Sequence, residues 1–274
     1  MAGPPTAWRR NFRESLEMIS ERQQGGGRPE PMLNAPAGIV WAIALLAGIH
    51  AGFDLMTESQ EEWWKLVLAF IPSRLTAPGP AFPGDLPGAA VWSFVTHQFI
   101  HADWAHVGLN CAWLLAFGGA VAARIGMLRF ALLGLASGIS GAVLFLLLHA
   151  DEAVPMAGAS GAVSGLMGGA CRFFFAALDR GGLHAFRDAP GLVPRMSLRQ
   201  TFADRRIRML LGIWFVLNFL TAMVAPYLTS SGGGIAWEAH LGGFLFGLFA
   251  FALFDPFPQA DPTGQDDGER HTLH

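Results

Sequence analysis

The sequence predicts an all-α polytopic membrane protein with six transmembrane helices. Hydrophobic residues make up 52% of the 274 residues and charged residues only 14%, whereas about a quarter of the residues in a typical soluble domain are charged. The apolar residues also gather in stretches of about 20, the length that an α-helix needs to cross the hydrocarbon layer. We place the six spans at residues 37–56, 104–123, 127–149, 158–178, 209–228 and 235–254.

The remaining segments are more polar and give the domain organisation. Residues 36–254 are predicted to form one membrane domain, preceded by an arginine-bearing cytoplasmic segment at residues 1–35. Within the domain, residues 57–103 are expected to form an outer loop, in which neighbouring tryptophans and charged residues predict an amphipathic helix at the membrane interface. Residues 179–207 are expected to form an arginine-rich cytoplasmic loop, and the acidic residues 255–274 a disordered tail.

The distribution of positive charge predicts the orientation of the spans. Membrane proteins keep an excess of Lys and Arg in the cytoplasmic loops. With both termini in the cytoplasm, all of the 18 Lys and Arg residues except Lys65 and Arg74 lie on that side or in the inner ends of spans. The fourth and sixth spans then both run inward, so that Ser160 and His240 are expected at similar depths near the outer surface.

Ser160 and His240 are the candidate catalytic residues. A hydroxyl beside an imidazole is the minimum that nucleophilic acyl chemistry requires, with the serine as nucleophile and the histidine as general base and acid. Glu238 is only two residues from His240 and therefore lies on a different face of the helix. Because no third member is evident, the residues predict a Ser–His dyad.

Glycines on both candidate helices favour close packing near this pair. Small residues four apart let two membrane helices approach closely, and a short serine side chain needs such an approach to reach an imidazole. Either helix alone is better explained by packing without chemistry; the two together, each with a reactive residue beside its glycines, favour a site. The five glycines are Gly158, Gly161, Gly165, Gly243 and Gly247.

Histidines before and within the second span allow two interpretations. His106 and Asn110 are four residues apart on one helix face, and both can donate hydrogen bonds to an oxyanion. His97 and His101 have the spacing of zinc ligands, so a zinc-dependent membrane protein using these two and His106 is the alternative. No HExxH motif supports that alternative. His50 and His149 stand alone at span ends and are predicted to have no role.

Three stretches together resemble the rhomboid intramembrane serine proteases. They read HADWAHVGLN at residues 101–110, GASG at 158–161 and AHLGG at 239–243, and with the six spans the resemblance covers residues 37–254. It implies a rhomboid-like bundle that cleaves transmembrane segments of membrane-anchored proteins. It also implies Ser160 as nucleophile, His240 as base and acid, and an oxyanion site formed by His106, Asn110 and the Ser160 amide.

The same resemblance sets the remaining expectations. Ser164 stands where many members carry an aromatic residue that packs on the catalytic histidine, so the sequence does not say how His240 is held. The expected partners are transmembrane protein substrates and the lipid bilayer, with no nucleic acid, no metal and no cofactor. A multi-pass protein of a bacterial inner (plasma) membrane is expected. The alternative function is a catalytically silent rhomboid-like protein that binds or sorts membrane helices.

Overall fold

A computed structural model describes residues 36–77, 79–180, 182, 186, 189–228 and 236–257 of the protein. The predicted segment at residues 1–35 and the predicted tail beyond Phe257 lie outside the described residues. In the described part every regular element is a helix, apart from one isolated backbone bridge between Phe70 and Met156. The helices are α2 Ala37–Phe53, α3 Glu58–Leu68, α4 Ser73–Thr76, α5 Ala89–Thr96, η1 His97–Phe99, α6 Trp104–Trp113, η2 Leu114–Gly118, α7 Gly119–Ile125, α8 Met127–Leu148, α9 Ser160–Ala170, α10 Phe174–Asp179, η3 Pro190–Leu192, α12 Leu198–Ala203, α13 Arg205–Leu228 and α14 Trp237–Phe254.

Among the described residues, four helical stretches are long and apolar enough to cross a membrane, which confirms the prediction of an all-α integral membrane protein. They are Trp104–Ile125, Met127–Leu148, Arg205–Val224 and Trp237–Phe254. The first predicted span corresponds to the shorter apolar helix α2, which has 17 residues. The count of six spans stays a prediction.

The continuous helix predicted over residues 158–178 is wrong. Helix α9 has 11 residues and ends at Ala170, and a turn at residues 171–173 separates it from α10. The turn places the Arg172 guanidinium in the interior, where it donates hydrogen bonds to the carbonyls of Met196 and Leu248. Because most of α9 is buried by other helices, its apolar residues reflect protein contacts rather than the thickness of a bilayer.

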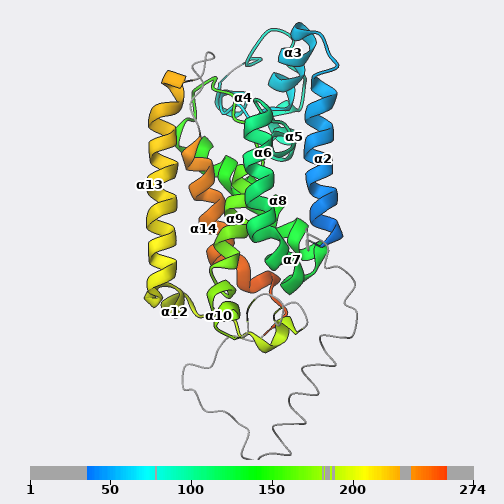
Figure 1. The fold of residues 1–274 in the computed structure, drawn as a ribbon. Coiled ribbons are helices and arrows are strands. Elements are labelled where there is room, and N and C mark those ends of the chain that lie inside the picture. Colours follow the sequence, from blue (N-terminus) through cyan, green and yellow to red (C-terminus); the bar gives the residue numbers. More distant parts are fainter. Residues whose placement is uncertain are drawn as a thin grey trace, which may run out of the picture. The chain divides into compact units, whose positions relative to one another are not determined.

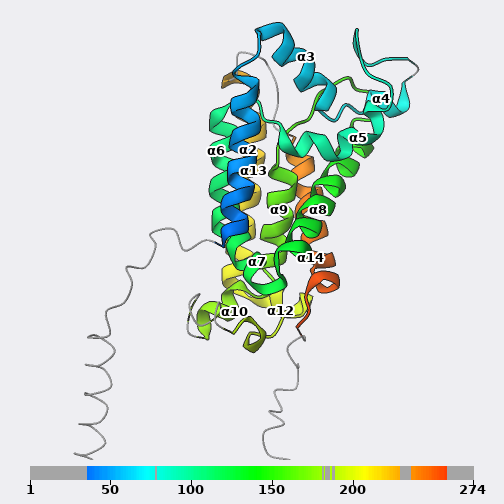
Figure 2. The same cartoon turned by 90° about the vertical axis from the view of Figure 1, so that its right-hand side faces the viewer.

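Helix α9 lies among α6, α8 and α14, as Figures 1 and 2 show, and its closest partner is α14. The two helices run in the same direction. A Cβ added at Gly243 would overlap the Gly161 carbonyl, and one at Gly247 would overlap the Gly165 carbonyl. These positions therefore accept only glycine at the observed separation, and the first turns of α9 and α14 are held side by side.

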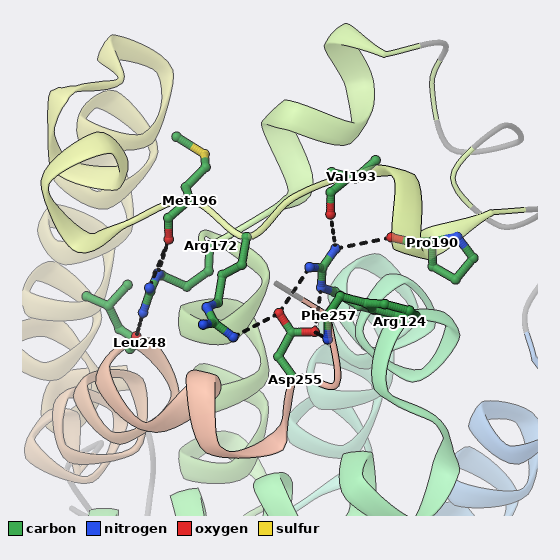
Figure 3. Close-up of polar contacts among 9 residues, drawn as sticks. Arg124, Arg172, Pro190, Val193, Met196, Leu248, Asp255 and Phe257 are labelled. Carbon is green, nitrogen blue, oxygen red and sulfur yellow. Dashed lines mark hydrogen bonds and ion pairs between the residues drawn. The ribbon is translucent and has the colours of Figure 1, made fainter. Parts of the chain in front are cut away.

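A buried charge cluster connects the end of α14 to α7 and to the segment at residues 193–195 (Figure 3). Asp255, directly after α14, lies 3.0 Å from the Arg124 guanidinium, and neither side chain is exposed. Arg124 also donates a 2.7 Å hydrogen bond to the carbonyl of Val193, and Arg195 lies 3.3 Å from Asp255. The cluster ties part of the predicted 179–207 loop to the bundle. It also corrects the predicted start of the tail, because Asp255 belongs to the folded part.

The predicted outer loop is largely helical and supports the beginning of α9. Helices α3, α4 and α5 lie at the end of the bundle where α9 and α14 begin (Figure 1). The amphipathic helix expected there is α3, which begins with a capping box at Thr57 and Gln60. The side chain of Arg74 is buried and connects parts of this loop: it forms an ion pair with Asp85 at 3.0 Å and donates hydrogen bonds to two carbonyls of the preceding segment.

Candidate active site

Ser160 and His240 lie in contact at the beginning of α9 and α14. The distance from Ser160 Oγ to His240 Nε2 is 2.7 Å, which is a hydrogen-bonding distance. Ser160 is the first residue of α9 and His240 is in the first turn of α14, so the parallel packing of these helices places both side chains at one level. Both residues are partly buried. The geometry suits transfer of the serine proton to the imidazole.

The chain enters α9 through a turn that only glycine accommodates easily. Gly158 has φ +127°, in the region that side chains rarely adopt. A Cβ added there would also lie 2.8 Å from His106 Cε1 and 3.7 Å from Ser160 Oγ. The bare glycine thus leaves room between the His106 ring and the serine hydroxyl. Its own N–H donates a 2.8 Å hydrogen bond to the carbonyl of His97, which fixes the turn.

His97 and His101 support this turn. His97 Nδ1 lies 2.7 Å from the carbonyl of Ser93, and His101 Nε2 accepts a 3.3 Å hydrogen bond from the Ala159 N–H. Burial lowers the pKa of His97 to about 4, and burial together with His106 and His50 lowers the pKa of His101 to about 3. Neutral imidazoles suit both contacts, since the Ala159 N–H needs an unprotonated ring nitrogen as its acceptor.

Of the two predicted oxyanion donors, His106 lies beside the serine. The His106 ring lies against Gly158, beside Ser160, and Asp103 caps α6 by accepting from the His106 backbone N–H. Asn110 is buried one turn further along α6, and its Nδ2 donates a 3.0 Å hydrogen bond to the carbonyl of His106. The structure thus brings His106 to the serine, while the amide of Asn110 is engaged within its own helix.

Asn218 is a site residue that sequence reasoning missed. Its Oδ1 lies 2.5 Å from His240 Nδ1, on the far side of the imidazole from Ser160. Its Nδ2 donates a 3.3 Å hydrogen bond to the carbonyl of Trp237, in the first turn of α14. The signal in the sequence was a single amide within an otherwise apolar span, and polar groups in spans usually face the protein interior and serve a function.

His149 is also more than the isolated histidine that the sequence predicts. Its Nε2 lies 3.2 Å from Glu238 and its Nδ1 lies 3.1 Å from Glu152. Glu238 therefore points to the end of α8 and not to His240, as its place on a different helix face predicts. His50 is buried and packs edge-on against Trp104.

The described residues contain no group of three or more His, Cys, Asp or Glu side chains placed to hold a metal ion. His97 and His101 direct a ring nitrogen to separate backbone groups. This arrangement gives the zinc alternative no geometric support.

The family model of the Rhomboid domain matches residues 88–256, which include all of the helices that carry the site. The chain belongs to the rhomboid family. Among curated rhomboid relatives, Rhomboid-like protease 1 of Toxoplasma gondii is 28% identical over 178 residues. The matched part is 65% of this chain and 52% of that relative, so the chain spans about half the length of the relative. Ser160, His240, His106 and Asn218 all lie within the rhomboid match.

Proposed function

We propose that this rhomboid is an intramembrane serine endopeptidase that cleaves transmembrane segments of membrane-anchored proteins. The observation that carries the proposal is the 2.7 Å contact between Ser160 Oγ and His240 Nε2, at the start of two helices that glycines hold together. A relative named as a rhomboid-like protease supports the same reaction class.

The proposed reaction proceeds by acyl transfer. Ser160 Oγ attacks the scissile carbonyl while His240 Nε2 takes its proton, and His240 then protonates the leaving amine. His106, Asn110 and the Ser160 amide donate hydrogen bonds to the oxyanion of the tetrahedral intermediate. A water molecule, activated by His240 in turn, releases the acyl group from the serine.

We further propose six spans with both termini in the cytoplasm, on the charge distribution of the sequence. Ser160 begins α9, and His240 lies three residues past the start of α14, about 4.5 Å along the helix axis. In this orientation the cut falls close to the outer surface, in a bacterial inner membrane. A released outer domain should therefore carry only a short piece of the substrate's span, and a cut in the cytoplasmic half would contradict the orientation.

The test is coexpression with a panel of single-span reporter proteins, comparing the wild type with Ser160→Ala. The proposal predicts that the wild type cuts at least one reporter and that the Ser160→Ala variant cuts none. Substantial cleavage by the variant would exclude Ser160 as the nucleophile. The zinc alternative instead expects loss of cleavage with a chelator, and the silent alternative expects reporters to be bound and left intact.

A further inference from the structure

Helix α13 is apolar along most of its length, but one of its few buried side chains is an amide, that of Asn218. Among its described side chains, at residues 205–224, only Ile207 and Asn218 are buried. Many of its large apolar side chains, such as Leu217 and Leu220, are exposed instead. Burying an amide is costly unless its groups are hydrogen-bonded. The position of Asn218 therefore calls for specific partners on the helix that it faces.

Asn218 has two partners on α14, Trp237 and His240, and both lie in the first turn of that helix. The Trp237 carbonyl can only accept a hydrogen bond, so the Asn218 group facing it at 3.3 Å must be the NH₂ group. The amide oxygen is then the atom that faces His240 Nδ1 at 2.5 Å. An oxygen can only accept, so Nδ1 must carry the proton of the imidazole.

This order of donors and acceptors fixes the tautomer of His240. With the proton on Nδ1, the neutral ring presents an unprotonated Nε2 to the Ser160 hydroxyl at 2.7 Å. We propose that Asn218 is a positioning residue that holds His240 in the tautomer able to take the serine proton. The proposal rests on the proposed serine-protease function and extends the predicted dyad to a Ser–His–Asn arrangement.

The role of Asn218 in the reaction is electrostatic and geometric. As Ser160 Oγ forms its bond to the scissile carbon, its proton moves to His240 Nε2. The Nδ1 proton stays on the imidazolium, where the amide oxygen continues to accept its hydrogen bond. The amide gains no proton at any step. A hydrogen bond to a charged partner is stronger than one to a neutral partner, so the contact tightens as the imidazolium forms.

Neighbouring aromatic pairs hold α13 in the register that this contact needs. Trp214 lies 5.0 Å from Phe244 and Phe219 lies 6.5 Å from Trp237, measured between ring centroids. Among the described residues, no close pair of rings includes His240 itself, and each of its two ring nitrogens lies within hydrogen-bonding distance of a partner. Figure 1 shows α13 at the edge of the bundle beside α14.

The test compares Asn218→Ala, Asn218→Asp and a control, Thr221→Val, in the purified protein. Thr221 is one turn along α13 and donates to carbonyls of its own helix, including that of Asn218. With a cleavable single-span reporter, Asn218→Ala should lower kcat about 10- to 100-fold with little change in KM, because a lost hydrogen bond to a charged group has that effect on a rate. Thr221→Val should keep the wild-type kcat.

Asn218→Asp separates positioning from packing. A carboxylate still accepts the Nδ1 proton, so this variant should recover most of the lost kcat at neutral pH. It should also shift the acid limb of the kcat profile to higher pH, because a carboxylate stabilises the imidazolium. Ser160 and His106 face His240 from α9 and α6 and are unchanged in every variant.

The outcomes distinguish this inference from the proposed function. If the wild type neither cuts a reporter nor reacts with a fluorophosphonate, the serine-protease function fails. If the wild type is active but Asn218→Ala keeps its kcat, the positioning role is wrong. An Asn218→Asp variant that matches Asn218→Ala in kcat, with an unshifted pH profile, would likewise overturn it.

Discussion

Ser160 Oγ and His240 Nε2 are 2.7 Å apart although 80 residues separate them in the chain. The contact depends on the parallel packing of α9 and α14, in which Gly243 and Gly247 lie directly against carbonyls of the partner helix. A side chain at either glycine would push the two helices apart and break the contact.

The Ser160–His240 pair should act as a unit. Ser160→Ala and His240→Ala are each expected to abolish cleavage, and the double variant should be no worse than either single one, because neither residue works without the other. The measurement is the rate of reporter cleavage, with thermal unfolding as the control for folding. Losses that multiply in the double variant would mean that the residues act independently.

His106 and Asn110 should contribute to turnover more than to binding. If each donates to the oxyanion, His106→Ala and Asn110→Ala should lower kcat about 100-fold or more, the usual loss for one such donor. Cys111→Ala, the next residue on α6, serves as the matched control. Measuring kcat and KM separately decides the role. If kcat is unchanged in Asn110→Ala, the role of Asn110 is limited to its observed hydrogen bond to the His106 carbonyl.

Much of this site could be predicted from sequence because short motifs carry it. Two such motifs mark the candidate catalytic residues: Ser160 has Gly158 and Gly161 on either side, and His240 comes shortly before Gly242 and Gly243. The break between α9 and α10 could not be predicted from such motifs, because apolarity alone does not distinguish a helix facing lipid from one buried in protein. Asn218 was missed because its contact with His240 depends on how α13 and α14 align, which no local pattern records.

The Arg124–Asp255 pair should matter for stability. Both side chains are fully buried, so Asp255→Asn should leave an unpaired buried guanidinium and cost about 3 kcal/mol of unfolding free energy. The matched control is Asp179→Asn, which breaks the exposed pair with Arg206 and should change stability little. Unfolding in detergent solution measures both. Equal effects of the two variants would contradict a special role for the buried cluster.

The contacts of His149 predict a pH dependence of stability. Burial lowers the pKa of His149, but Glu152 and Glu238 outweigh burial and raise it above the ordinary value. A raised pKa in the folded state stabilises the fold below the ordinary value of 6.5, and the contribution is lost as pH rises through the folded-state pKa. As the pH rises from about 6 to about 9, the wild type should therefore lose more thermal stability than His149→Gln. If thermal stability changes with pH in the same way for the two proteins, the contacts of His149 with Glu152 and Glu238 contribute nothing to this dependence.

The central claim, that Ser160 is the nucleophile and His240 its base, is tested most directly by mapping a fluorophosphonate adduct. The purified protein is treated with the reagent, digested and analysed by mass spectrometry. The account predicts an adduct on Ser160 in the wild type and its near-complete loss in His240→Ala. An active wild-type protein with no adduct on Ser160, or equal labelling of Ser160 in His240→Ala, would contradict it.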